Sequence, residues 1–363
     1  MTPTSAPDQA SSPKLRLALL SVIALALVAL VLTLSAIPAF RPIDFGNYMT
    51  AAGLLLRGAN PYPAVEFFAP PWSILLLAPF TLLPPDLAAG VWLILSAFAQ
   101  VACAALALRW LGIPVSRRKR SALLSLSALL PAAIFTYLTG QVSTFVALAL
   151  LLALWACARP AFHPAVLGLL LGAAALKPHL AAVPALLCAL ELLRHRQWTR
   201  LAWTGLIFTL LAGLSFLLLP GWVPALMDAW LGGAFRGGPE LAARGYLGLL
   251  ELGVPYILLL PALAYTLYAC IKEGLTPRVA ALALASGLLL APYTRVYDQV
   301  LLTFPAILAV CVYRPGKRLA AALILFAAFV LPLTPAWMLA PAACCAGLAL
   351  LPPTQLPPAD PDP

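Results

Sequence analysis

Charged residues are scarce in this sequence of 363 residues. They make up 9% of the chain, against roughly a quarter of an ordinary soluble domain, while hydrophobic residues make up 63% and the mean hydropathy is +0.99. So many apolar side chains cannot be buried in one soluble core, and they therefore need lipid around them. Lipid admits only helices or closed barrels, and the long leucine and alanine runs lack the alternation of a barrel strand. The sequence predicts an all-α polytopic membrane protein.

Motifs of metal and redox chemistry are also missing. The sequence has no Cys-x-x-Cys pair, no His-Glu-x-x-His helix and no glycine-rich phosphate loop, and its seven cysteines are dispersed apart from Cys344-Cys345. The cysteines are therefore predicted to be small apolar packing residues rather than a disulfide set or a metal site. Neither a nucleotide donor nor a resident cofactor is indicated, and a divalent metal bridging a carboxylate and a phosphate stays open as an alternative.

The basic residues lie in short clusters between apolar runs, although the formal net charge is +10. This pattern is typical of cytoplasmic loops and not of the continuous basic stripe of a nucleic-acid-binding surface. We therefore expect the lipid bilayer as a partner and no nucleic acid. Lys14, Arg16, the cluster 117–120 and the cluster 194–200 are placed on the inner side.

Twelve spanning helices fit between these clusters. The predicted spans are 15–37, 86–109, 123–138, 142–158, 164–176, 180–193, 201–219, 247–271, 279–292, 300–313 and two runs that flank Thr334-Pro335. The run 15–37 is longer than the 7–15-residue core of a signal peptide, so it is predicted to be a retained first helix. The run 69–86 is short and broken by Pro79, and a full crossing would move the cluster 117–120 outside. This run is therefore predicted to be re-entrant or to lie at the outer interface.

One transmembrane domain, residues 14–351, accounts for the whole folded chain in this prediction. The tails 1–13 and 352–363 are polar or rich in proline and are expected to be disordered. A long outer loop, 220–246, carries Trp222 and Trp230, which suit the membrane interface. The expected location is the plasma membrane.

This assignment of spans and loops to the two sides of the membrane uses only the basic clusters. It nevertheless places several polar residues together on the outer face. Asp44 follows the first span at this face, and Gln141, Lys177 and Asp298 lie at helix breaks that reach it. A carboxylate near hydrocarbon is costly and usually functional, whereas one at a helix exit can also be an ordinary solvated residue.

A short helix is predicted over residues 47–57, ahead of a turn at 58–62. One of its faces is apolar and suits lying on the lipid surface. That face holds Tyr48, Ala51, Ala52 and Leu55.

Five segments follow one another from the first outer loop to a late outer motif. They are DFGNYMTAAGLLLRGANPY from Asp44, APPWSILLLAPFTLLP from Ala69, GQVSTFVALALLLAL from Gly140, GLLLGAAALKPHLAAVPALL from Gly168 and LAPYTRVYDQVLLTFPAIL from Leu290. Together they resemble glycosyltransferase family 87 (DUF2029-like), a family of GT-C-type membrane enzymes that use a polyprenyl-phosphate sugar, often mannose. The resemblance implies a GT-C-like fold and an outer-face active site with an aspartate in the first outer loop, which matches Asp44.

The chain departs from the family pattern at three places. Val142-Ser143 follows Gly140-Gln141 where the family commonly has asparagine next, and Ala69 stands where the family has tyrosine. Many members carry histidine where this chain has Tyr297-Asp298. These differences bear on the identity of the substrate more than on the fold.

Sugar transfer from a lipid phosphate needs a base for the acceptor hydroxyl and cations for the departing phosphate. Asp44 is predicted to be the catalytic base, and the residues predicted to bind the donor phosphate are Lys177, Arg295 and His179. The residues predicted to bind the substrates are Tyr48, Asn60, Tyr62, Gln141, Tyr293 and Asp298, with Glu66 as a further contact for the acceptor.

Most of these roles have a plainer alternative. Lys177 and Arg295 also suit snorkelling at helix ends, and His179 also suits the membrane interface. Gln141 also suits a helix cap. Asp298 is expected to orient Arg295, to bind sugar hydroxyls or to form a plain salt bridge with Arg295.

The sequence thus predicts a hexosyltransferase that moves a hexose, with mannose expected, from a polyprenyl-phosphate sugar to a hydroxyl of a glycan or glycolipid acceptor at the extracytoplasmic face. The competing prediction is a polytopic transporter or flippase of a lipid-linked sugar or another anionic substrate, since such proteins also combine many helices with buried charges. A transporter would place those charges near the midplane between paired halves, whereas here they gather toward one face.

Overall fold

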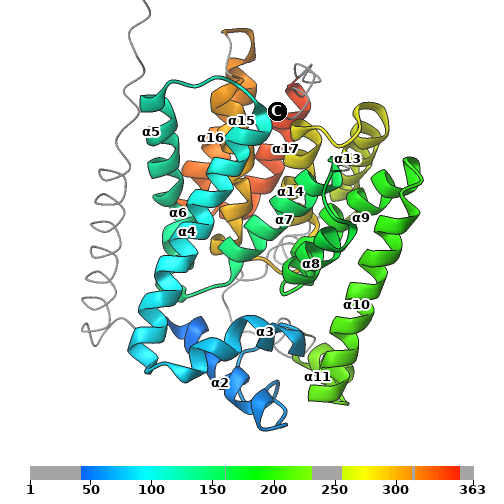
Figure 1. Cartoon of the computed structure of the whole chain (residues 1–363). Helices are drawn as coiled ribbons and strands as arrows, with labels where there is room; N and C mark the ends of the chain where they lie inside the picture. Colours follow the sequence, from blue (N-terminus) through cyan, green and yellow to red (C-terminus); the bar gives the residue numbers. More distant parts are fainter. Residues whose placement is uncertain (1–41, 160, 231–255, 313–314, 352–363) are drawn as a thin grey trace, which may run out of the picture.

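The computed structural model describes residues 42–159, 161–230, 256–312 and 315–351, and every regular element in these ranges is a helix (Figure 1). The α-helices are α2 (Ile43–Leu56), α3 (Ile74–Leu77), α4 (Pro85–Leu111), α5 (Arg117–Ala128), α6 (Pro131–Thr139), α7 (Ser143–Cys157), α8 (Pro164–Ala174), α9 (Pro178–Arg194), α10 (Trp198–Leu218), α11 (Trp222–Ala229), α13 (Leu260–Glu273), α14 (Pro277–Leu290), α15 (Thr303–Cys311), α16 (Arg318–Phe329) and α17 (Ala340–Leu350). The 3₁₀ helices are η1 (Pro71–Ser73), η2 (Ala78–Leu82), η5 (Tyr256–Leu259), η6 (Val296–Leu302), η7 (Pro315–Lys317), η8 (Leu331–Leu333) and η9 (Trp337–Leu339). The all-α prediction is confirmed for these ranges.

Two of the described helices, α4 and α10, are long and apolar enough to cross a bilayer. A third span results if α5 and α6, which meet at an angle of 46°, form one bent crossing. The other apolar helices have 10–17 residues, fewer than the roughly 20 of a regular span. The apolar helices are those of a membrane protein, but the count of twelve spans stays a prediction. The first predicted span, 15–37, both tails and residues 247–255 lie outside the described residues.

Helix ends that carry basic residues lie together at one end of the bundle. Arg109 is in the last turn of α4, α5 begins at Arg117, and Arg194 is in the last turn of α9. Figure 1 shows these ends on one side, while α2, α3 and α11 lie at the opposite end. This arrangement agrees with the predicted membrane topology, in which the basic clusters lie on one side of the membrane.

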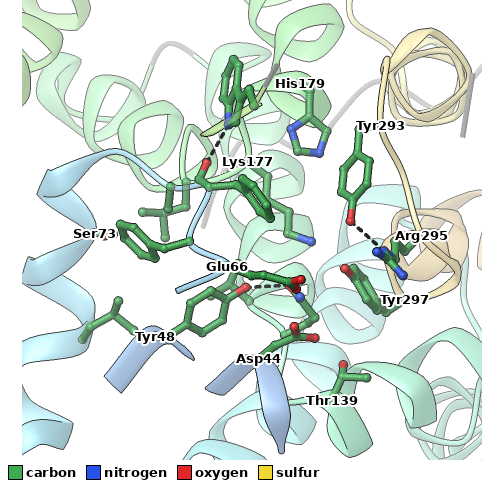
Figure 2. Close-up of a pocket in the computed structure, with 18 of the residues that line it drawn as sticks. Asp44, Tyr48, Glu66, Ser73, Thr139, Lys177, His179, Tyr293, Arg295 and Tyr297 are labelled. Atoms are coloured by element: carbon green, nitrogen blue, oxygen red, sulfur yellow. Dashed lines mark hydrogen bonds between the residues drawn. The ribbon is translucent and has the colours of Figure 1, made fainter. Parts of the chain in front are cut away.

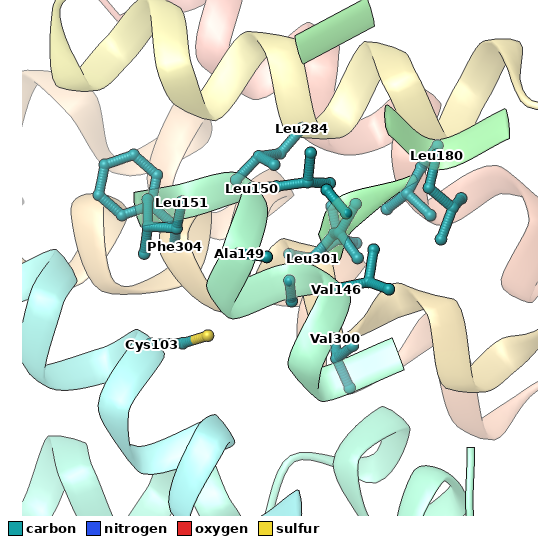
Figure 3. Close-up of a cluster of buried hydrophobic side chains, with 14 of the residues drawn as sticks. Cys103, Val146, Ala149, Leu150, Leu151, Leu180, Leu284, Val300, Leu301 and Phe304 are labelled. Carbon is teal, nitrogen blue, oxygen red and sulfur yellow. The ribbon is translucent and has the colours of Figure 1, made fainter. Parts of the chain in front are cut away.

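Helix α7 passes through the centre of the core. Its side chains Val146, Ala149, Leu150 and Leu151 are buried in a cluster with residues from α4, α9, α14, α15 and η6 (Figure 3). All seven cysteines are free thiols, and six of them, Cys103 among them, are buried. The interpretation of the cysteines as small packing residues agrees with these positions.

Glycines let α8 and α10 pack closely. A Cβ atom on Gly168 would lie 3.0 Å from the Cβ of Ile207, and one on Gly172 would lie 2.5 Å from Cδ1 of Leu211. Spaced four residues apart, the two glycines form the small-residue seam that favours helix packing in lipid.

The segment predicted to be re-entrant contains the three short helices η1, α3 and η2, over Pro71–Leu82. Twelve helical residues extend about 18 Å, less than the roughly 30 Å of a hydrocarbon core. The segment packs against α2. The backbone N–H of Trp72 donates a hydrogen bond of 3.1 Å to the Ser215 hydroxyl of α10. Its length and packing agree with a segment that does not cross.

Two details of α2 correct the sequence-based predictions. The helix begins at Ile43 rather than at residue 47, because Pro42 suits the position before a helix, so Asp44 lies in the first turn. The predicted apolar face exists, with Tyr48, Ala51, Ala52 and Leu55 buried, but it packs against α3 and η2 rather than on lipid. The residue pattern of an apolar helix face is the same whether protein or lipid covers that face. The sequence therefore could not distinguish packing against protein from contact with lipid.

Candidate active site

A cavity of about 370 Å³ lies where α2, the segment before η1, two helix breaks and the segment 292–297 meet (Figure 2). Seven of the predicted site residues line it: Asp44, Tyr48, Gln141, Lys177, His179, Tyr293 and Arg295. Glu66, expected to contact the acceptor, also lines it. These residues are far apart in the sequence, and the fold brings them to one space.

The break between α6 and α7 brings Gln141 next to Asp44. Gly140 ends α6 in the left-handed conformation, at φ +74°, which favours glycine. A Cβ atom there would lie 2.6 Å from the Cβ of Phe45 and 2.7 Å from that of Pro42, so the first turn of α2 rests directly on the break. The Gly140 carbonyl also accepts a 2.9 Å hydrogen bond from Trp92 Nε1 of α4. The residues close to Asp44 on both sides, Pro42 and Phe45, are thus packed against Gly140.

Asp44 is half-buried and faces both signs of charge. Burial raises the pKa of this carboxyl above its ordinary value, and the nearby Glu66 carboxylate adds to that effect. A side-chain hydrogen bond with Gln141 and the charges of Lys177 and Arg295 act in the opposite direction. A carboxylate whose pKa is raised binds a proton more readily, which suits a general base.

Lys177 points into the cavity from the break between α8 and α9, and it is ion-paired. Its Nζ lies 2.6 Å from Oδ1 of Asp298 and donates a 2.9 Å hydrogen bond to the Ser143 hydroxyl. The same Nζ lies 4.5 Å from the ring centre of Tyr297, within cation–π range. Of the three alternatives for Asp298, the salt bridge with the Arg295 side chain is wrong, because the ion-pair partner of Asp298 is Lys177.

Asp298 has no exposed surface and is not among the lining residues. Its Oδ2 accepts a 2.9 Å hydrogen bond from the backbone N–H of Arg295, and Ser143 donates a 2.8 Å bond to its Oδ1. Asp298 thus supports Lys177 and the backbone of Arg295 rather than facing a substrate.

Arg295 has the less compensated charge. Its Nε donates a 2.6 Å hydrogen bond to the Tyr293 hydroxyl, and among the described residues it forms no ion pair with a carboxylate. Figure 2 shows Arg295, Lys177 and Asp44 directed toward the same space. His179 is close by, with its ring centre 6.2 Å from that of Tyr293, and its Nε2 is buried without a hydrogen-bond partner in the described part of the chain. An anion in this space would meet a guanidinium, an ammonium and an imidazole nitrogen.

Asn60 and Tyr62 are placed outside the cavity. The Asn60 side chain accepts a 3.1 Å hydrogen bond from the backbone N–H of Tyr62, which closes a turn. The buried Tyr62 hydroxyl donates a hydrogen bond of 3.0 Å to the carbonyl of Ala69. Both residues shape the segment that carries Glu66 and Phe68, and neither is among the residues that line the cavity.

The sequence alone did not identify several lining residues. Phe68, Tyr297 and Trp230 add aromatic surface to the cavity, and Trp230 Nε1 donates a 3.1 Å hydrogen bond to the Phe68 carbonyl. Trp222, expected at the interface with lipid, packs its ring against those of Trp72 and Phe216. Aromatic residues near an outer loop suit both a membrane interface and a binding site, so only their placement separates the two.

A metal site is not evident from the donor atoms. Among the described residues, no group of three histidine, cysteine, aspartate or glutamate side chains could hold a metal ion. Asp44 and Glu66 are the carboxylates that line the cavity.

Comparison with known proteins gives a family match. The model of glycosyltransferase family 87 matches residues 67–292, which is more than half of the chain. No curated protein and no solved structure matched the chain. The matched range contains Gln141, Lys177 and the aromatic Phe68, while Arg295 follows its end at residue 292 and Asp44 precedes its start at residue 67. The resemblance seen in the sequence is confirmed, and the protein belongs to glycosyltransferase family 87.

Proposed function

We propose that the protein transfers a hexose, with mannose expected, from a polyprenyl-phosphate sugar to a hydroxyl of a glycan or glycolipid acceptor. The observation that supports this most directly is the cavity itself, in which the Asp44 carboxylate faces Arg295 and Lys177. A base and a phosphate-binding group in one enclosed space are what such a transfer needs.

In the proposed reaction Asp44 takes the proton of the acceptor hydroxyl. The acceptor oxygen then forms a bond to the anomeric carbon of the donor, and the bond between that carbon and the phosphate oxygen breaks. The electron pair of the broken bond stays on the departing lipid phosphate. Arg295 stabilises the resulting charge, because Lys177, the other lysine or arginine that lines the cavity, is paired with Asp298, whereas no ion pair compensates Arg295 among the described residues.

Lys177 and His179 complete the proposed phosphate site. The ion pair with Asp298 reduces the net charge that Lys177 presents, so its contribution is a directed N–H donor more than a free charge. An unpaired buried nitrogen such as His179 Nε2 costs free energy until a partner reaches it, and a phosphate oxygen would be such a partner. Tyr293 holds Arg295 in place through its hydroxyl.

The lipid nature of the donor is supported by apolar residues that border both the cavity and the surroundings of the protein. Ile43 and Met227 line the cavity, yet 77% and 43% of their surfaces are exposed. Exposed apolar side chains beside a polar cavity suit a ligand with a polar head and a hydrocarbon tail. The side of the membrane follows from the basic clusters, which lie at the end opposite to α2, and it is proposed to be extracytoplasmic.

The experiment is an assay of purified protein in lipid nanodiscs with polyprenyl-phosphate sugars, a nucleotide-sugar control and a panel of acceptors, with products read by mass. The wild-type protein is expected to transfer sugar only from the lipid donor. Asp44→Asn should fold normally and turn over about 10²–10⁴-fold more slowly, as is typical when a positioned base is lost. Asp86→Asn, an exposed aspartate in the first turn of α4, is the matched control and should behave like the wild type.

Two outcomes would contradict the proposal. Normal turnover by the Asp44→Asn variant would remove Asp44 as the base. Movement of a lipid-linked sugar across the bilayer without any transfer product would favour a flippase instead.

A further inference from the structure

Tyr48, Gln141 and Asp44 form a chain of side chains along one wall of the cavity. Asp44 and Tyr48 are four residues apart on α2, so they lie on the same face of the helix. The Tyr48 hydroxyl donates a 2.7 Å hydrogen bond to Oε1 of Gln141, shown as a dashed line in Figure 2. Gln141 lines the same cavity as Asp44, and hydrogen bonding by its side chain lowers the pKa of that carboxyl.

The chemistry of the three side chains determines which group donates and which accepts in each of their hydrogen bonds. An ionised carboxylate only accepts hydrogen bonds, so the amide of Gln141 must turn its nitrogen toward Asp44. The amide oxygen then points away from Asp44, toward Tyr48, and the hydroxyl there can satisfy it by donating. A hydrogen bond at one end of an amide polarises it and strengthens the bond at the other end.

Gln141 has little freedom to adopt another arrangement. It is 6% exposed, and its backbone N–H donates a 3.1 Å hydrogen bond to the Thr136 carbonyl. The preceding Gly140 is pressed against Pro42 and Phe45, which fixes the distance from the break to α2. Tyr48 is likewise buried, with Phe67 and Trp92 packed near its ring.

We propose that Tyr48 and Gln141 are positioning residues for Asp44: the tyrosine hydroxyl orients the glutamine amide, and the amide nitrogen holds the carboxylate toward the cavity. This rests on the proposed role of Asp44 as the base. It changes the expected role of both residues, since the groups predicted to bind substrate are engaged with one another. Gln141 also lowers the pKa of Asp44, against the larger effect of burial.

Other charged and titratable groups also face Asp44. They are Glu66 from the segment before η1, Lys177 from the start of α9, Arg295 and Tyr297 from the segment at η6, and Tyr48 on α2 itself. A test must therefore change the amide without removing any of them. Gln141→Glu does so, since it keeps the shape and places a second carboxylate beside Asp44. Gln141→Leu removes the hydrogen bond, and Tyr48→Phe removes only the hydroxyl that orients the amide.

The primary measurement is an infrared pH titration of the carboxyl band that the Asp44→Asn variant lacks, which reports the protonation of Asp44 without any substrate. The midpoint is expected to rise by about one pH unit or more in Gln141→Glu, because like charges in one site raise one of the two pKa values strongly. Smaller rises are expected for Gln141→Leu and for Tyr48→Phe. Gln197→Glu, the same exchange in the turn before α10, should leave the midpoint unchanged.

The second measurement is the pH profile of kcat/KM for the same variants. Its acid limb should move to higher pH in step with the infrared midpoint, and KM for the donor should stay within about twofold of the wild type. An unchanged midpoint in both Gln141 variants would overturn the proposal, as would a donor KM that rises while the acid limb stays in place. A midpoint that shifts as expected in a protein that transfers no sugar would leave the positioning intact and overturn the proposed function.

Discussion

Lys177 and Asp298 form a buried ion pair between residues 121 positions apart, with 2.6 Å between Nζ and Oδ1. The pair joins the break before α9 to the first turn of η6, and so it fixes the two segments that supply Lys177 and Arg295 to the cavity. Because the Asp298 carboxylate has no exposed surface, its charge depends on Lys177 for compensation.

Removing one member of this pair is expected to destabilise the protein. Lys177→Met leaves the Asp298 carboxylate buried without its cation and should cost about 3–5 kcal/mol, whereas the double variant Lys177→Met with Asp298→Leu should recover most of that loss. Thermal unfolding in detergent measures both effects. Equal stability of the single and the double variant would show that the two charges are not coupled. The double variant should still use the lipid donor poorly, because the N–H donor of Lys177 is gone.

Arg295 is expected to act on the donor and not on the acceptor. Arg295→Gln should lower kcat/KM for the lipid donor about 10- to 100-fold, since a hydrogen bond to a charged group contributes about 1.5–3 kcal/mol. Arg57→Gln, at the exposed end of α2, serves as the control. Steady-state kinetics with each substrate varied in turn measures the change, and an acceptor KM that rises instead would place Arg295 on the acceptor side.

The pH dependence of transfer should report the surroundings of Asp44. A base must be ionised to act, so activity is lost as pH falls through the pKa of Asp44, and burial raises that pKa above 3.8. The Glu66 carboxylate raises it further, so Glu66→Gln should move the acid limb of kcat/KM to lower pH. An acid limb that stays in place would mean that Glu66 does not influence the base. Asp86→Asn again provides a charge-matched control.

Gly140 is expected to tolerate no side chain. Gly140→Ala places a Cβ against Pro42 and Phe45 at a positive φ, which should cost about 1–2 kcal/mol for the backbone and about 1–3 kcal/mol for overpacking. Gly46→Ala is a matched control in α2, where nothing lies within 4 Å and alanine should stabilise the helix by about 0.5–1 kcal/mol. Unfolding temperatures compare the two, and an innocuous Gly140→Ala would mean that α2 does not rest on this break.

The orientation in the membrane can be tested by thiol labelling after the native cysteines are replaced. Asn60 and Ser116 are both exposed, on the segment that follows α2 and just before α5, respectively. Asn60→Cys should react with an impermeant reagent added outside intact cells, and Ser116→Cys should react only after the cells are opened. The reverse pattern would place the cavity on the cytoplasmic side.

Local features of the sequence predicted local features of the structure. Gly140 and Pro178 interrupt apolar runs near the predicted breaks because a left-handed residue or a missing N–H acts on its own turn of helix. The run 69–86 is short and broken by Pro79, which predicts that it does not cross, and the structure divides it into three short helices over Pro71–Leu82. The break before Pro131, which bends α5 against α6, follows the same rule but was not predicted.

Pairings over long distances could not be predicted in this way. A salt bridge with Arg295 was one of the alternatives for Asp298, yet its ion-pair partner is Lys177, which comes from another helix break. Asn60 and Tyr62 carry groups that suit sugars, but the backbone around them uses those groups first. Side-chain type gives the possible partners, and only the packing of the helices decides among them.

The exposure of α10 to lipid makes the protein sensitive to the thickness of the bilayer. Its apolar window is only 6% buried, and its 21 residues extend about 32 Å, close to the thickness of a hydrocarbon core. One end follows the basic cluster 194–200, and the other continues into α11, beyond which Trp230 reaches the cavity. A helix longer than a thinned hydrocarbon core tilts, kinks or locally thickens the bilayer, and α10 is joined to the segment before α3 by the hydrogen bond between Trp72 and Ser215. We therefore expect the width of the cavity opening to change with membrane thickness, which is set by the length of the acyl chains.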